Sequence, residues 1–438
     1  MLAPYAVTSS GGWLVLVFTI YSGTRFAMTL FASPARPVRV FAWFYFYVFL
    51  GIAPLVQLSG STWALPSTPL SNASVTSTAL IVFLFVMAWD VAGVVVQRRT
   101  TSVIYPPRRF EVSNQRIVVL AAIALLVAAY EVHQIGGVGQ LFTSRLQRAT
   151  SLQSLSTASK GIANALLVYP VFVCAYVLLA ARRFRRARSL RVLTFFMTAA
   201  ALVLANPESN SRYSVGTVYL GLAFAWVWPL TKNQMVTVGL TALIGLFIVF
   251  PALNKFRTNA HTTPVIGGVS AQLTRGDYDS FEQIANTQKY VAAKGHTDGA
   301  QELSALLFFV PRTVWSTKAS DTGVIVGQFM GYSFTNLSAP APAEAYIDGG
   351  VAWVVVIGAL IGGGSTWLDK RASDPNNRVT YVGLFTPIFA VYQVIMLRGS
   401  LLQSMGGIAA ISGALLLCMH HKVASTTGVP QPADILPV

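Results

Sequence analysis

Long apolar stretches separated by short polar ones run through most of the chain. A helix needs about 20 mainly apolar residues to cross the roughly 30 Å hydrocarbon layer of a membrane. Stretches of this kind, of which the sixth is short, lie at 12–33, 38–58, 76–97, 117–135, 161–181, 192–206, 213–230, 235–253, 349–368, 379–397 and 400–420. The pattern predicts an all-α polytopic membrane protein with about eleven transmembrane helices.

Composition agrees with this prediction and narrows the function. The chain is 54% hydrophobic and 11% charged, whereas soluble domains carry about 25% charged residues. Its net charge of +16 comes from arginines grouped between apolar stretches, which is typical of membrane topology and argues against a nucleic-acid partner. Cys174 and Cys418 lie within apolar stretches, as free core cysteines do. The sequence shows no metal-ligand spacing and no glycine-rich phosphate loop, so we predict neither a metal nor a cofactor.

The basic residues predict how the chain is oriented in the membrane. Lysine and arginine concentrate in the short cytoplasmic loops of membrane proteins. Here they concentrate in loops 98–116 and 182–191, and one alternating arrangement also places the smaller groups inside: Arg36, Arg39, Lys232, Lys370, Arg371, Arg378 and Lys422. This arrangement puts the N-terminus outside and the C-terminus in the cytoplasm. The first apolar stretch has no basic residue before it and no cleavage site, so we expect it to be a retained span.

The same arrangement divides the chain into four parts. Residues 1–253 form a bundle of eight spans, residues 254–348 a large extracytoplasmic loop that is partly helical, and residues 349–422 three further spans. Residues 423–438 are expected to be a disordered cytoplasmic tail. The loop 254–348 carries more than half of the chain's 15 acidic residues. Because so long a loop without a function is unusual, we expect the functional site there.

Two charged residues lie within predicted spans. Arg25 and Asp90 each fall about 20 Å below the outer end of their span at the rise of an α-helix. Charges at such depth are costly unless they are paired or hydrated. We therefore hypothesise an ion pair between the first and third spans, the alternative being that each charge reaches water separately.

Arginines recur on the predicted outer side, where the topology rule predicts few. They are Arg145, Arg148, Arg212, Arg257, Arg275, Arg312 and Arg398. A guanidinium binds phosphate through two parallel hydrogen bonds and cannot lose its charge. Several arginines around one cavity would hold a lipid-linked diphosphate without a metal. The alternative for each is contact with lipid headgroups.

The segment "FFVPRTVWSTK" at 308–318 is a candidate part of that site. Arg312 and Lys318 would lie at headgroup level, and Trp315 would stack on a sugar ring or belong to the interfacial aromatic belt. Glu344 and His261 are the candidate proton acceptors near the membrane, each with a capping or interfacial role as the alternative. Asp277 and Asp279 are interpreted as part of a polar helical surface.

Several segments together carry a family resemblance. In chain order they are "GGVGQLFTSRLQR", "ANPESNSRYSVGTVYLG", "FVPRTVWSTKASDTG", "NLSAPAPAEAYIDGG" and "MLRGSLLQSMGG", within about residues 115–410. Their order and predicted external location resemble bacterial oligosaccharide repeat-unit polymerases of the Wzy type, which are related to O-antigen ligases.

The resemblance implies a fold, a place and a reaction. It implies a GT-C-like glycosyltransferase in the bacterial cytoplasmic (inner) membrane, acting on its outer face. The substrates would be undecaprenyl-diphosphate-linked oligosaccharides, with membrane lipids and a chain-length regulator as further candidate partners. A hydroxyl of one repeat unit would attack the anomeric carbon of the growing chain, which then leaves its lipid diphosphate.

Other classes of membrane protein stay open at this point. An O-antigen ligase would share the chemistry but use another acceptor, and a flippase or transporter would have internal repeats and charges at the midplane. A GT-C enzyme that uses a lipid monophosphate normally has acids in its first external loop, and loop 59–75 has none. A structural membrane protein is the last alternative.

Overall fold

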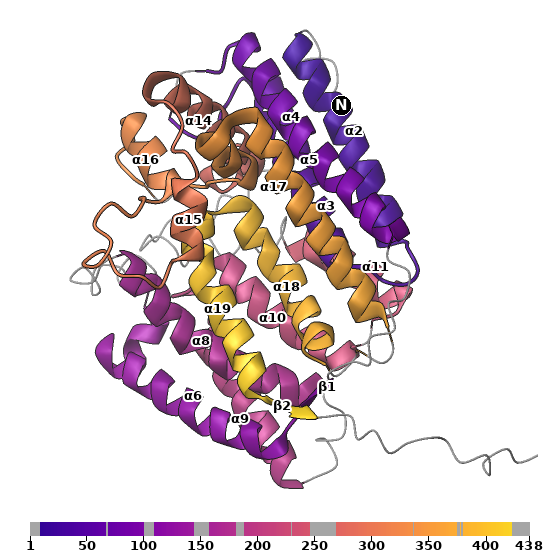
Figure 1. Cartoon of the computed structure of the whole chain (residues 1–438), viewed down its shortest axis with the longest axis vertical. Coiled ribbons are helices and arrows are strands. Elements are labelled where there is room, and N and C mark those ends of the chain that lie inside the picture. The colour runs from indigo at the N-terminus through magenta and orange to yellow at the C-terminus, as the bar shows by residue number, and fades with distance from the viewer. Residues whose placement is uncertain are drawn as a thin grey trace, which may run out of the picture.

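The computed structural model describes residues 9–66, 69–99, 109–143, 157–180, 188–228, 230–245, 269–335, 337–374, 377 and 380–422. Helices dominate this part of the chain (Figure 1). The bundle consists of α2 (Ser10–Leu30), α3 (Pro37–Tyr45), the π-helix η1 (Phe46–Ile52), α4 (Ala53–Gly60), α5 (Asn72–Arg99), α6 (Asn114–Gln134), α8 (Thr157–Ala180), α9 (Arg188–Leu204), α10 (Arg212–Val227), α11 (Lys232–Ile244), α17 (Ala341–Ser373), α18 (Tyr381–Arg398) and α19 (Leu401–Leu417).

Shorter elements connect these helices. They are β1 (Arg109–Val112), the 3-10 helix η2 (Val138–Phe142), α13 (Val269–Leu273), the 3-10 helix η6 (Gly276–Tyr278), α14 (Ser280–Lys294), α15 (Ala300–Leu306), α16 (Thr322–Phe329) and β2 (Met419–Lys422). Strands β1 and β2 pair antiparallel. This ribbon lies at the opposite end of the bundle from α14 and α16 (Figure 1). The ribbon, which belongs to predicted cytoplasmic segments, and the helices α14 and α16 of the predicted external loop therefore lie at opposite ends.

The helices confirm a polytopic, helical membrane protein. Within the described residues, each predicted apolar stretch coincides with a helix. In the part of the chain that the structure describes, the helices long and apolar enough to cross a membrane number 7: Gly11–Leu30, Pro37–Gly60, Asn72–Arg99, Asn114–Gln134, Gly161–Ala180, Ala341–Ser373 and Tyr381–Arg398. Helices α9 and α19 are apolar but shorter. The predicted tail 423–438 lies outside the described residues.

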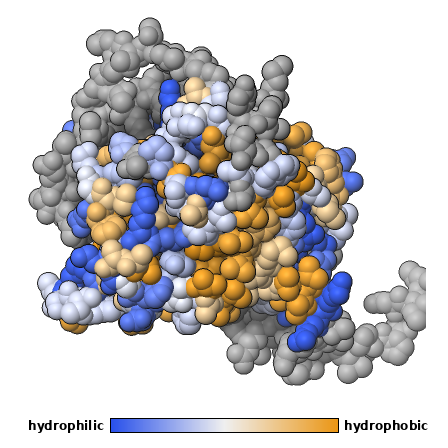
Figure 2. All heavy atoms as spheres, turned by 90° about the horizontal axis from the view of Figure 1, so that it is seen from above, coloured by the Kyte–Doolittle hydropathy of each residue, from blue (hydrophilic) through white to orange (hydrophobic). Residues whose placement is uncertain are grey.

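Large apolar side chains on the outside of the bundle match a lipid environment. Ile20, Leu126, Phe195 and Leu360 are all more than half exposed. Seen from the end that carries α14 and α16, apolar residues (orange) cover a broad area on one flank, and hydrophilic residues (blue) gather beside it (Figure 2). A soluble protein rarely exposes so many large apolar side chains in continuous areas.

Helices α5 and α17 pack unusually closely. Gly358 and Gly362 of α17 are four residues apart, the spacing of small residues that lets membrane helices approach. A Cβ atom at Gly358 would lie 2.6 Å from the carbonyl oxygen of Phe85, and one at Gly362 would lie 2.0 Å from that of Trp89. The two glycines therefore allow backbone-to-backbone contact across this interface.

The predicted pair of charges inside the bundle is confirmed. Arg25 of α2 forms an ion pair with Asp90 of α5, and Tyr21 donates a hydrogen bond to the other carboxylate oxygen at 2.8 Å. Arg39 adds a second ion pair to Asp90 at 2.7 Å. One carboxylate thus joins helices α2, α3 and α5.

Arg39 itself corrects the sequence interpretation. The charge pattern groups it with cytoplasmic loop cations, but its residue is only 2% exposed. The reason is that α3 begins at Pro37, so Arg39 lies in the first helical turn. Asp369 of α17 accepts backbone N–H bonds from Val38 and Arg39 at 2.9 Å each, and so caps this helix end from across the bundle.

Helix α17 has a break where the predicted loop ends and the predicted span begins. Gly349 and Gly350 have non-helical backbone angles, and Gly350 has a φ of 65° that favours glycine. The break separates a short arm, 341–348, from the long helix that follows. Asp348 fixes this arm to the loop, because its carboxylate accepts the backbone N–H groups of Gln301 at 3.1 Å and Glu302 at 2.9 Å.

Candidate functional site

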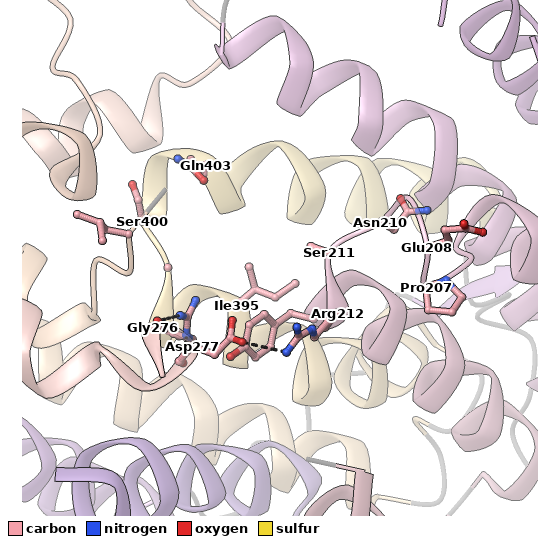
Figure 3. Close-up of a pocket in the computed structure, with 14 residues that line it drawn as sticks. Pro207, Glu208, Asn210, Ser211, Arg212, Gly276, Asp277, Ile395, Ser400 and Gln403 are labelled. Atoms are coloured by element: carbon pink, nitrogen blue, oxygen red, sulfur yellow. Dashed lines mark hydrogen bonds and ion pairs between the residues drawn. The ribbon is translucent and has the colours of Figure 1, made fainter. Parts of the chain in front are cut away.

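A cavity of about 190 Å³ lies at the loop end of the bundle, between the start of α10, the 3-10 helix η6 and the turn from α18 to α19. Figure 3 shows Ser400 and Gln403 at one end of it and Pro207 and Glu208 at the other. The lining residues are Pro207, Glu208, Asn210, Ser211, Arg212, Tyr213, Gly276, Asp277, Leu337, Ile395, Arg398, Gly399, Ser400 and Gln403. All belong to segments near the predicted outer membrane surface.

Arg212 reaches the cavity from the first turn of α10. Ser211 is the N-cap of this helix, and its hydroxyl accepts the backbone N–H of Ser214 at 3.3 Å. The Arg212 guanidinium forms an ion pair with Asp277 at 2.9 Å (Figure 3). The polar segment before α10 thus caps the start of this helix and holds Arg212 at the cavity.

Arg398 reaches the cavity from the last turn of α18. Its guanidinium lies 5.1 Å from the centre of the Tyr213 ring. Its Nε donates to the carbonyl of Asp277 at 3.1 Å, and Nη2 forms an ion pair with Asp279 at 3.2 Å. Asp279 is 1% exposed and also accepts the N–H of Ser338 at 3.1 Å. Burial raises the pKa of the Asp279 carboxyl, and Arg398 opposes this rise.

The charges and polar groups of the lining suit a ligand that is both anionic and rich in hydroxyl groups. Two guanidinium groups face carboxylates, so each cation is held in a fixed orientation. The amide oxygen of Asn210, the amide of Gln403 and the hydroxyls of Ser211 and Ser400 add neutral polar groups to the lining. A sugar diphosphate has complementary groups of both kinds.

Glu344, a candidate proton acceptor, lies behind the cavity wall. It is 2% exposed, and its carboxylate accepts the backbone N–H of Leu401 at 2.8 Å. Ser400, the residue before Leu401, lines the cavity. Asp321 is a second buried carboxylate beside Glu344. The arm 341–348 of α17 thus places Glu344 in contact with Leu401, the neighbour in sequence of the lining residue Ser400.

The segment 308–318 closes on itself and is not part of the cavity lining. The Lys318 ammonium donates to the carbonyls of Leu307, Phe308 and Val310 at 2.7–3.0 Å. These bonds occupy all three of its donors. Its predicted role as a ligand of the substrate remains a prediction.

The other two candidates of this segment also make contacts within it. Arg312 is exposed and donates to the carbonyls of Lys318 and Ala319, the latter at 2.8 Å. Trp315 is half-buried and donates from its indole nitrogen to Thr317 at 3.0 Å. Their predicted roles as ligands of the substrate remain predictions.

The remaining candidates lie outside the described residues. They are Arg145, Arg148, Arg257 and His261. Of the predicted substrate-binding arginines, the described structure brings together Arg212 and Arg398 in one cavity.

Sequence reasoning missed the carboxylates that hold the two arginines. Asp277 and Asp279 are interpreted there as helix-surface residues. In the structure Asp277 lies in η6 and Asp279 is the N-cap of α14, and they pair with Arg212 and Arg398. Their acidic spacing gives no signal of this, since their partners are distant in sequence. The polar residues just before Arg212 were the sequence signal that could have identified Asn210 and Ser211 as cavity-lining residues.

Comparisons with protein-family models, with curated proteins and with solved structures find no match for this chain.

Proposed function

We propose that the protein is a membrane glycosyltransferase that polymerises undecaprenyl-diphosphate-linked oligosaccharide repeat units on the extracytoplasmic face. The single observation that carries this proposal is the meeting of Arg212 and Arg398, from two separate helices, in one polar cavity at the loop end of the bundle. We further propose a GT-C-like arrangement of about eleven spans. In it, the four helices α9, α10, α11 and α19 cross the membrane in addition to the seven long ones.

The proposed chemistry follows from what the two guanidinium groups can do. In glycosyl transfer from a lipid diphosphate, negative charge builds up on the departing diphosphate. Fixed N–H donors aimed at that charge are commonly the largest catalytic contribution. Asp277 and Asp279 hold the guanidinium groups in place before substrate arrives, so little reorganisation is needed during the reaction.

A reconstitution experiment tests the proposal. Purified protein in lipid nanodiscs is incubated with undecaprenyl-diphosphate-linked repeat units, and the glycan products are separated by size. A ladder of polymer is the expected result, and EDTA should leave it unchanged because arginines take the place of a metal. Transfer of a single unit would instead indicate a ligase. Absence of any product together with movement of the lipid across the bilayer would support a flippase.

A further inference from the structure

Two buried carboxylates meet next to the cavity. Glu344 lies on the short arm of α17 and Asp321 precedes α16 as its N-cap, where one oxygen accepts the backbone N–H of Gly323 at 2.8 Å. Both residues are more than nine-tenths buried, at 2% and 8% exposure. Asp321 acts electrostatically on Glu344 as a like charge. Two buried carboxylates that interact in this way cannot both be ionised at low cost, so the charge of Asp321 raises the pKa of Glu344.

Ser400 connects this pair to the cavity. It is 3% exposed, lines the cavity, and its side chain interacts with both carboxylates. Yet Ser400 Oγ, Thr322 Oγ1 and Asp321 Oδ2 lack a completed hydrogen bond to any described residue. These side chains therefore lie close enough to the two carboxylates to interact with them, but no hydrogen bond of normal geometry fixes the two hydroxyl groups.

The N-terminus of α19 also favours negative charge here. The backbone N–H of Leu401, the first residue of that helix, donates a hydrogen bond to the Glu344 carboxylate, with 2.8 Å between nitrogen and oxygen. A helix N-terminus stabilises a neighbouring carboxylate. One carboxylate of the pair can thus be ionised before a reaction and take up a proton during it. By contrast, Asp348 on the same arm has both oxygens occupied by backbone N–H groups of Gln301 and Glu302.

We propose that Asp321 and Glu344 form a proton-accepting pair that serves the cavity through the hydroxyl of Ser400. The inference rests on the proposed glycosyl transfer and names the groups that take the acceptor's proton. The O–H bond of the acceptor hydroxyl breaks as its oxygen bonds to the anomeric carbon. That proton passes to Ser400 Oγ while the Ser400 proton passes to the carboxylate pair. The bond between the anomeric carbon and the diphosphate oxygen breaks, and its electron pair leaves on the diphosphate.

The test compares variants of the full-length protein in the polymer assay described above. Glu344→Gln and Asp321→Asn should each lower the turnover rate by about 100-fold or more, the usual contribution of a positioned proton acceptor. The KM for the lipid-linked repeat unit should change by less than about threefold, because the pair lies behind the wall and does not hold the diphosphate. Ser400→Ala should also lower turnover, and Glu344→Asp, which keeps a carboxylate, should recover part of the rate lost in Glu344→Gln.

Asp348→Asn is the matched control, since it changes a buried carboxylate of the same arm that already has its partners. It should lower thermal stability but leave the turnover of folded protein within about threefold. If Glu344→Gln and Asp321→Asn also stay within that range, the proton-accepting pair is excluded and the glycosyl transfer stands. Turnover that falls only in proportion to the folded fraction would likewise reduce the pair to a structural role. If neither wild-type protein nor Arg398→Lys forms polymer, the proposed function fails. This inference then fails with it.

Discussion

Arg39 of α3 and Asp90 of α5 lie 2.7 Å apart inside the bundle, and Arg25 of α2 contacts the same carboxylate oxygen. Asp90→Asn removes the only charge that offsets Arg39 within this group of three. Breaking a buried ion pair by removing one partner typically costs about 3–5 kcal/mol, because the other charge stays buried. We expect a clear drop in the melting temperature of the detergent-purified protein and in the amount of folded protein.

Arg25→Gln is the control for that change. The Arg25 side chain is 24% exposed and can reach water, whereas that of Arg39 is 3% exposed. The loss of Arg25 also leaves Asp90 paired with Arg39. Its melting temperature should therefore fall less than that of Asp90→Asn, and an equal fall would contradict the central role of Asp90.

Close packing of α5 against α17 makes a second prediction. In Gly362→Ala the new Cβ would lie 2.0 Å from the carbonyl oxygen of Trp89, so the helices must separate. Overpacking of this kind usually costs about 1–3 kcal/mol. Gly364→Ala, on the exposed face of the same helix, meets nothing within 4 Å. Thermal unfolding should show a loss in the first variant and none in the second.

Substitutions at Arg398 and Arg312 distinguish two possible places of substrate binding, the cavity and the exposed segment 308–318. Arg398→Lys keeps the charge but loses the planar group that contacts Asp279 and the Asp277 carbonyl. We expect polymer formation to fall by about 100-fold, the scale of one lost transition-state donor. Arg312→Lys changes a residue outside the cavity lining and should have a far smaller effect. A larger loss in Arg312→Lys would move the diphosphate site to segment 308–318.

Asp321 predicts a dependence of stability on pH. Burial raises the pKa of its carboxyl above the usual value of about 3.9, and interactions with Ser400, Gln403 and the N–H groups of Gly323 and Val324 oppose the rise. A raised pKa in the folded state contributes stability that is fully present below about pH 4 and is lost as pH rises through the folded-state pKa. Asn at this position keeps the helix cap and does not titrate.

The melting temperature of wild type relative to Asp321→Asn should therefore decrease as pH rises from about 4 to 8. Differential scanning fluorimetry of both proteins in the same detergent measures this difference. A difference that stays constant over the range would show that Asp321 has no raised pKa in the folded protein.

The bundle was predictable because its signals are local. Apolar stretches give the helices directly, and the equal depth of Arg25 and Asp90 in two spans that run in the same direction suggested the ion pair as one of two alternatives. Asp369 gave no such signal, since it stands beside Lys370 and Arg371 and looks like part of a charged loop. Its partners Val38 and Arg39 are 331 and 330 positions away. Only the fold brings them together.

The candidate site was predictable only in part for the same reason. Arg212 and Arg398 could be selected because arginine is rare on the outer side of a membrane. Asp277 and Asp279 could not, because acids are common in external loops and their spacing is unremarkable. What distinguishes them is burial and the arginines they meet, and both depend on how residues 277–279 lie against the start of α10 and the end of α18.

The contacts of Arg398 can form only late in the synthesis of the protein. Arg398 follows its partner Asp277 by 121 positions, and α15 also packs against α19. The ribosome therefore completes the large loop well before the helices that hold it exist. Until α18 and α19 enter the membrane, Asp279 has no arginine from α18 to pair with. A nascent chain halted after α17 would carry the loop and Arg212 but no completed cavity.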